Sequence, residues 1–161
     1  MALKTHKAVA EEYLAGATAK VSHSFGVPAA AVWAALLDAH AWTQWLPITK
    51  VTWTSPQPFG VGTTRTVEIG DAKVEEYFFA WEEGKRMAFR FAASPLPISA
   101  AVEDYRVVET AGGCELHWAG RASAIFPLNI LVNKQLAGGL KSGMPKLEAI
   151  IRAEPARFGL S

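Results

Sequence analysis

Residues 136–151 read LAGGLKSGMPKLEAII, and this stretch does most to define the architecture of the chain. Its large apolar residues, Leu136, Leu140, Met144, Leu147 and Ile151, recur at steps of three and four. That spacing places them on one face of an α-helix. The stretch therefore predicts one long amphipathic helix after Phe126 that covers a sheet.

The segments before this helix alternate between apolar and polar residues with a period of two, which is typical of half-buried strands. Gly70-Asp71 and Gly112-Gly113 mark tight turns between such segments. Strands joined by short turns run antiparallel. We predict about seven strands, in or near the ranges 21–25, 51–53, 65–69, 73–81, 87–91, 99–109 and 115–124.

Two short helices are expected directly after the first strand. Pro28 stands where the first turn of a helix accepts proline, and residues 29–38 have a helix-forming composition rich in alanine and leucine. The second helix is expected from Ala39 to Trp45, because the residue before Pro47 is pushed away from helical geometry. The fold class is therefore α+β, with a curved antiparallel sheet wrapped around the C-terminal helix.

This order of elements, together with four short segments, resembles a known superfamily. The segments are VPAAAVW at 27–33, WLP at 45–47, EYF at 76–78 with Trp81, and CELHW at 114–118. They are similar to the polyketide cyclase/dehydrase and lipid-transport group of the START-like (SRPBCC, helix-grip) superfamily, over about residues 20–152. The resemblance implies a deep apolar cavity between the sheet and the terminal helix. We expect a single START-like ligand-binding domain at 19–155, preceded by an N-terminal appendage at 1–18 that holds a short helix.

Composition and charge exclude several classes of protein. The 161 residues suit one domain, and with 50% hydrophobic and 19% charged residues the chain should fold alone. A net charge of +1 without a basic run predicts no nucleic-acid partner. No apolar run approaches the roughly 20 residues that span a bilayer, so no integral membrane segment is expected. Because Cys114 stands alone and no secretory signal is visible, the expected compartment is the cytoplasm.

The sequence holds no motif for a nucleotide, cofactor or metal. Gly60-Val61-Gly62 lacks the strand-turn-helix setting of a dinucleotide fingerprint, and neither a Walker-type loop nor a Gly-x-Ser-x-Gly elbow is present. No two histidines have metal-ligand spacing on one element, and Cys114 supplies no second ligand. We predict neither a cofactor nor a metal. The oligomeric state and the identity of the ligand are left open.

Strand parity predicts which side chains face the cavity, because residues two apart on a strand share a face. The sharpest candidates are Arg65, Glu76 and Glu103, since a charge on an inner face is costly unless it is paired or solvated. Trp42 and Trp45 are placed at the mouth. The predicted ligand-binding residues are Arg65, Glu76, Phe78, Phe89, Phe91, Glu103, Tyr105, Trp118, Trp42, Trp45, Leu136, Leu140 and Met144.

Alternatives remain open for these residues. Any one of the aromatic side chains could simply pack the core, and the charged residues could form an internal salt bridge or be turned outward by a bulge. In the functional interpretation, Arg65 anchors a ligand carboxylate or carbonyl while Glu76 or Glu103 orients a hydroxyl. Burial would then raise the pKa of such a carboxyl.

Three functions follow from this interpretation. The leading one is binding of a hydrophobic small molecule, such as a lipid, isoprenoid or polyketide-like compound. The second, implied by the resemblance, is a polyketide cyclase or dehydratase in which Glu76, Glu103 or His23 moves protons. The third is a peripheral interaction module, in which an exposed apolar turn from Pro95 to Ile98 docks on a membrane or a protein.

Overall fold

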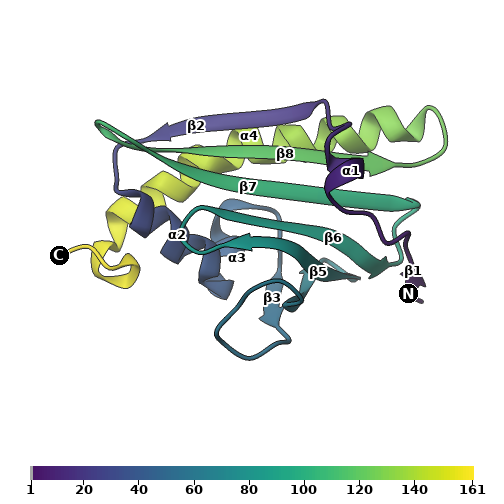
Figure 1. The fold of residues 1–161 in the computed structure, drawn as a ribbon, viewed down its shortest axis with the longest axis horizontal. Helices are drawn as coiled ribbons and strands as arrows, with labels where there is room; N and C mark the ends of the chain where they lie inside the picture. Colours follow the sequence, from purple (N-terminus) through teal and green to yellow (C-terminus); the bar gives the residue numbers. More distant parts are fainter. Residues whose placement is uncertain (1) are drawn as a thin grey trace.

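The computed structural model describes residues 2–161, which form one antiparallel sheet with a long helix along its inner face (Figure 1). The strands are β1 (Lys4–Thr5), β2 (Ala19–Phe25), β3 (Lys50–Trp53), β4 (Thr64–Ile69), β5 (Ala72–Glu82), β6 (Arg86–Ser94), β7 (Ala100–Thr110) and β8 (Gly113–Ser123). Seven of them follow in the order β2-β8-β7-β6-β5-β4-β3, and β1 pairs with the end of β6. The predicted sheet of about seven strands is confirmed.

The helices also match the predicted order. Helices α2 (Ala29–Leu37) and α3 (Ala39–Trp45) follow β2 and gather at one end of the sheet, while α4 (Leu128–Ala153) runs along it (Figure 1). A short 3-10 helix, η1 (Pro155–Phe158), follows α4, and its buried Phe158 extends the packed core beyond residue 155. Among the residues that the structure describes, no helix is long and apolar enough to cross a membrane.

Helix α4 packs through the face that its sequence period predicts. Leu140, Met144, Leu147 and Ile151 are all buried against the sheet and the short helices. At Gly143 the helix comes so close to α3 that an added Cβ would lie only 2.6 Å from the carbonyl oxygen of Trp45. The glycine therefore sets how closely α4 approaches α3.

The N-terminal segment covers part of the outer face of the sheet. It contributes β1 and the short helix α1 (Glu11–Leu14), whose Leu14 packs against Val102 of β7. Asp104, two residues further along β7, shares that outer face and is also buried. Within the predicted appendage at 1–18, β1 and α1 are thus packed on the sheet, and β7 is covered on both sides.

Strand β5 departs from regular pairing but keeps its predicted inward residues. Its register against β6 shifts between Glu75 and Glu76 and again between Phe78 and Ala80. Glu76 nevertheless lies opposite Arg65 of β4, and both Glu76 and Phe78 are buried. The irregularities do not turn Glu76 outward.

Candidate functional site

A cavity of about 180 Å³ lies between the inner face of the sheet and the N-terminal half of α4. Strands β4 to β8, the loop after α3 and the turn between β6 and β7 complete its wall. Apolar side chains form most of this wall. Among residues 2–161, the charged side chains that line it are those of Arg65, Glu76 and Glu103. The cavity therefore combines an apolar surface with one small polar region, which is the usual make-up of a small-molecule site.

Arg65 and Glu76 form a buried ion pair at the cavity wall. Arg65 Nε donates a hydrogen bond to Glu76 Oε1 at 2.6 Å, and the two residues are only 2% and 4% exposed. Arg65 Nη1 has no hydrogen-bond partner among residues 2–161, and Glu76 Oε2 accepts no hydrogen bond from them. The internal salt bridge weighed from the sequence is thus present, but it leaves part of each group's hydrogen-bonding capacity unused.

Glu103 is held by two neutral donors. Its Oε1 accepts a hydrogen bond from Tyr105 Oη at 2.8 Å and another from Trp118 Nε1 at 2.9 Å. Glu103 is 7% exposed, and its Oε2 accepts no hydrogen bond from residues 2–161. The two donors fix the carboxyl group in place without neutralising its charge.

Burial controls the protonation of this polar region. Burial raises the pKa of Glu76 to about 7; the neighbouring Glu103 charge also raises it, and the Arg65 guanidinium lowers it. Burial likewise raises the pKa of Glu103, against the lowering effects of its hydrogen bonds from Trp118 and Tyr105 and of the Arg65 charge. The cavity therefore contains a carboxyl group that changes its protonation near neutral pH.

Four aromatic rings surround the guanidinium of Arg65. The distances from Arg65 Cζ to the ring centroids are 4.5 Å for Trp42, 4.9 Å for Phe89, 5.1 Å for Trp53 and 5.2 Å for Phe78. Aromatic rings at such distances attract a cation through their electron-rich faces. The rings thus stabilise the buried charge and fix the orientation of the guanidinium.

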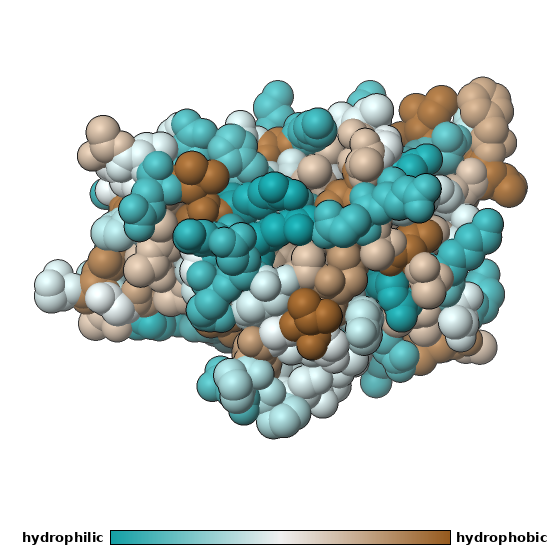
Figure 2. Space-filling view, in the orientation of Figure 1, coloured by the Kyte–Doolittle hydropathy of each residue, from teal (hydrophilic) through white to brown (hydrophobic). Residues whose placement is uncertain are grey.

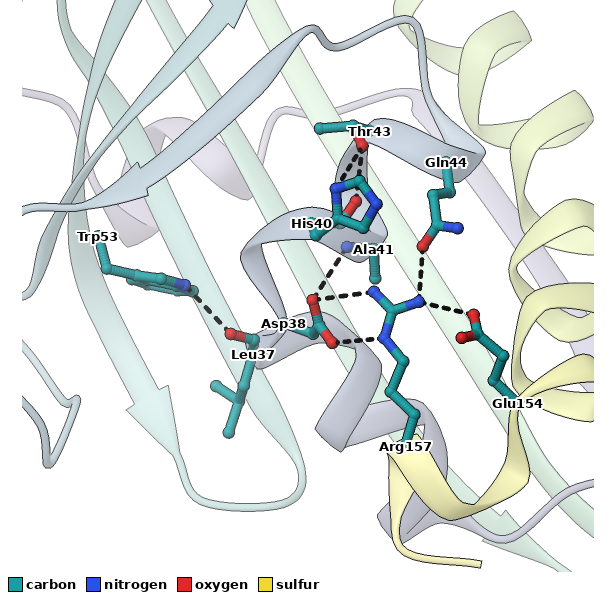
Figure 3. Close-up of polar contacts among 9 residues, drawn as sticks. All are labelled: Leu37, Asp38, His40, Ala41, Thr43, Gln44, Trp53, Glu154 and Arg157. Atoms are coloured by element: carbon teal, nitrogen blue, oxygen red, sulfur yellow. Dashed lines mark hydrogen bonds and ion pairs between the residues drawn. The ribbon is translucent and has the colours of Figure 1, made fainter.

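A polar network around Arg157 joins the residues after α4 to Asp38 and Gln44 of the α3 region (Figure 3). Helix α3 also carries Trp42, which lines the cavity. Arg157 Nε and Nη2 donate to the two carboxylate oxygens of Asp38 at 3.0 and 3.2 Å, and Nη1 donates to Gln44 Oε1 at 2.8 Å. Asp38 Oδ1 also accepts from the backbone N of Ala41 at 3.1 Å, which caps the start of α3. Residues after α4 therefore help to position one wall of the site.

Most of the predicted ligand-binding residues reach the cavity. Those that line it are Arg65, Glu76, Phe89, Phe91, Glu103, Tyr105, Trp42, Leu136 and Leu140. Phe78, Trp118, Trp45 and Met144 are buried behind the wall. Trp45, expected at the mouth, lies under α4 instead, because Gly143 allows the helix to pack directly against it.

His23 does not line the cavity. Its Nε2 lies 3.0 Å from Glu148 Oε1 on the C-terminal half of α4, and its ring packs edge-on against Phe25. Because β2 is an edge strand beside that half of α4, its inner face meets the helix rather than the cavity. His23 is therefore not placed to transfer protons to a ligand in the cavity. Among residues 2–161, no three or more His, Cys, Asp or Glu side chains are grouped to hold a metal ion.

Some residues of the site were missed from the sequence. The loop after α3 contributes Leu46, Pro47 and Ile48, and β5 contributes Val74. The parity that selected Glu76 would also have selected Val74, two residues earlier. The loop residues carry no periodic signal, and only their place after α3 brings them to the cavity.

The turn from Pro95 to Ile98 faces the cavity more than solvent. Leu96 and Ile98 are partly buried and line the cavity wall, so the expectation that this apolar turn is exposed is wrong for its two largest side chains. Exposed apolar side chains instead gather near the β8–α4 turn, at the upper right of Figure 2. They are Ile125, Phe126, Ile130 and Leu131.

A sheet that grips a long C-terminal helix over an apolar cavity with a buried polar region defines the helix-grip class of ligand-binding folds. The chain belongs to the polyketide cyclase/dehydrase and lipid transport family, which it matches over residues 17–152. The resemblance found in the sequence is thereby confirmed. Membership of this family suggests hydrophobic ligand binding and does not specify the ligand.

Individual proteins support the same assignment. An uncharacterized protein of Mycobacterium tuberculosis is 47% identical over an alignment of 117 residues, which covers 66% of this chain and 70% of that protein. The solution structure of a Thermobifida fusca protein matches with a TM-score of 0.69 and 21% identity, covering 84% of this chain and 93% of that one. DynU16, from the dynemicin biosynthetic locus, matches with a TM-score of 0.64 and 20% identity, covering 88% of this chain and 50% of that one. At these identities the two structures establish the fold alone.

Proposed function

We propose that this protein binds a hydrophobic small molecule, such as an isoprenoid, a polyketide-like compound or another lipid, in the cavity under α4. The observation that carries the proposal is the cavity of about 180 Å³, with an apolar wall and a buried polar region at Arg65, Glu76 and Glu103. Buried charged groups are costly to keep without a compensating role. Family membership supports the same function.

Two adjacent glycines of α4 allow a matched test. Gly139 lines the cavity and Gly138 is exposed, and a Cβ added at either position would meet no heavy atom within 4 Å. Leucine at either position should also favour the helix by about 1 kcal/mol, because glycine is a poor helix former. Gly139→Leu is expected to fill the cavity, whereas Gly138→Leu changes only the surface.

The test measures ligand uptake by native mass spectrometry and by thermal shift with a panel of apolar small molecules. Wild type and Gly138→Leu should bind the same compounds and show a higher Tm with them, since a ligand that binds only the folded state stabilises it. Gly139→Leu should fold and lose that response. If the two variants respond alike, or if wild type carries no adduct and responds to no compound, the proposal fails.

Acid–base catalysis is a second candidate, favoured by the pKa of about 7 at Glu76 within the cavity. In this scheme the cavity folds a poly-β-ketone chain, and Glu76 or Glu103 transfers protons during cyclisation or dehydration. Glu76→Gln and Glu103→Gln separate the two functions. Unchanged ligand affinity with lost turnover supports an enzyme, and a parallel loss of affinity supports a binding protein.

A further inference from the structure

The polar region of the cavity holds more acidic than basic side chains. Of the three charged side chains that line the cavity, one is a guanidinium and two are carboxyl groups. Arg65 donates a 2.6 Å hydrogen bond to Glu76, whereas its charge acts on Glu103 without a hydrogen bond between them. The two donors that hold Glu103, Tyr105 and Trp118, are neutral. When both carboxyl groups are ionised, a further negative charge from a ligand would be buried here without a counter-charge, which is strongly unfavourable.

The guanidinium is also poorly placed to attract an anionic ligand. Its charge is already compensated by Glu76 and by the faces of four aromatic rings, of which Trp42 is the closest at 4.5 Å. Arg65 Nη1 is buried without a hydrogen-bond partner among residues 2–161, and the hydrogen bonds that hold Glu76 and Glu103 end on their Oε1 atoms. A hydroxyl group complements this set, because it can donate to a carboxyl oxygen and accept from a guanidinium.

The size of the cavity limits the rest of the molecule. An apolar cavity of about 150 Å³ in another protein holds a benzene molecule. At about 180 Å³, this cavity has room for roughly one substituted ring. The wall around that space is built from aliphatic and aromatic side chains such as Val67, Phe91 and Leu140.

We propose that the ligand of this cavity is an uncharged, hydroxyl-bearing apolar molecule, a phenol or an alcohol about one ring in size, and that the site rejects carboxylates. The hydroxyl donates to the free oxygen of Glu103 or Glu76. This inference rests on the proposed binding function and narrows its ligand class. It also replaces the carboxylate-anchoring role expected for Arg65 with a hydroxyl-binding role shared by the three charged residues.

Four compounds with the same isopropylphenyl body test the proposal: 4-isopropylbenzyl alcohol, 4-isopropyltoluene, 4-isopropylbenzoate and 4-isopropylbenzylammonium. Their Kd values are measured by calorimetry at pH 7.5. The alcohol should bind at least about tenfold more tightly than the hydrocarbon, the gain expected from one hydrogen bond to a charged group. The benzoate should bind at least about tenfold more weakly than the hydrocarbon, because its charge is left uncompensated.

Glu103→Gln and Asp104→Asn provide a matched pair of variants. Glu103 faces the cavity and Asp104 faces the opposite side of β7. Glu103→Gln keeps an acceptor for Tyr105 and Trp118 but removes the charge, so it should weaken the discrimination against benzoate about tenfold. Asp104→Asn should leave the order of the four compounds unchanged.

The outcomes distinguish the hydroxyl assignment from the proposed binding function. If the hydrocarbon binds but the benzoate or the ammonium compound binds more tightly than the alcohol, the hydroxyl assignment is wrong while cavity binding stands. Discrimination that survives unchanged in Glu103→Gln also overturns the role given to Glu103. If none of the four compounds binds, the hydrocarbon included, the proposed binding function fails as well.

Discussion

Two neighbouring residues of β7 carry carboxyl groups into opposite environments. Asp104, on the outer face, accepts hydrogen bonds from Arg86 Nε at 2.9 Å and Arg106 Nε at 2.8 Å, and Arg86 also pairs with Glu11 at 2.8 Å. Glu103, on the inner face, accepts hydrogen bonds only from neutral side chains. The outer cluster thus has two guanidinium groups for two carboxyl groups. The inner cluster, at the cavity, has one guanidinium group for two carboxyl groups. The outer cluster is Arg86, Arg106, Asp104 and Glu11, and the inner cluster is Arg65, Glu76 and Glu103.

The difference separates a structural cluster from the one that we propose contacts the ligand. The outer charges are paired with one another. Asp104 is buried, but its neighbours Glu11 and Arg106 are more than half exposed, where ion pairs add little beyond local stability. The inner charges are buried, incompletely paired and placed at a cavity. A protein keeps such a group at a cost in stability, and incompletely satisfied polar groups concentrate at functional sites.

The largest expected effect is the loss of the inner guanidinium. Arg65→Met should lower the free energy of unfolding by about 3–5 kcal/mol, because it leaves two buried carboxyl groups without a cation. Urea denaturation measures the change. Adding Glu76→Leu to this variant should recover much of the loss, since an apolar pair can replace a buried ion pair. A single variant as stable as wild type would contradict this account of the inner cluster.

The second effect is the pH dependence of stability that Glu76 imposes. Because the pKa of Glu76 is raised to about 7 in the folded state, the folded protein binds more protons than the unfolded chain between the ordinary glutamate pKa of 4.5 and about 7. Stability should therefore fall as the pH rises through this window, by up to about 3 kcal/mol. Glu76→Gln should flatten the slope of unfolding free energy against pH, while Asp104→Asn should keep it. Equal slopes in wild type and Glu76→Gln would rule out this role.

A smaller effect is expected from the outer cluster. Asp104→Asn weakens both hydrogen bonds from Arg86 and Arg106, yet Arg106 is half exposed and remains hydrated. The free energy of unfolding should fall by about 1–2 kcal/mol. Chemical denaturation and ligand titration together check the result. A large loss of ligand affinity in this variant would contradict the claim that only the inner face of β7 contributes to ligand binding.

The smallest effect is expected at the network that positions α3. Arg157 and Asp38 have side chains 22% and 25% exposed, so solvent screens their ion pair. Arg157→Ala should lower the free energy of unfolding by about 1 kcal/mol. Because α3 carries Trp42, the variant should also weaken ligand binding more than Asp104→Asn does. Thermal denaturation measures the change in stability, and a ligand titration measures the change in affinity. Unchanged ligand affinity would show that Arg157 does not affect how α3 is positioned at the cavity.

The architecture was accessible from the sequence because its signals are local. The step of three and four from Leu136 to Ile151 predicted α4, and Pro28 and Pro47 bounded the two short helices. Alternation along the strands also placed Arg65, Glu76 and Glu103 on the inner face, where they are buried. In each case the pattern reports which face of one element is apolar, and that depends only on residues close together in the chain.

Which inward residues border the cavity and which pack behind its wall depended on contacts between distant elements. Phe78 and Phe89 share an inner face, yet only Phe89 lines the cavity. His23 is on the inward side of β2 but meets Glu148, because β2 pairs at the edge of the sheet. Periodicity assigns a direction to a side chain but not the distance to what faces it. That distance is set by the sheet order and by approaches such as Gly143 against Trp45, which exist only once the chain has folded.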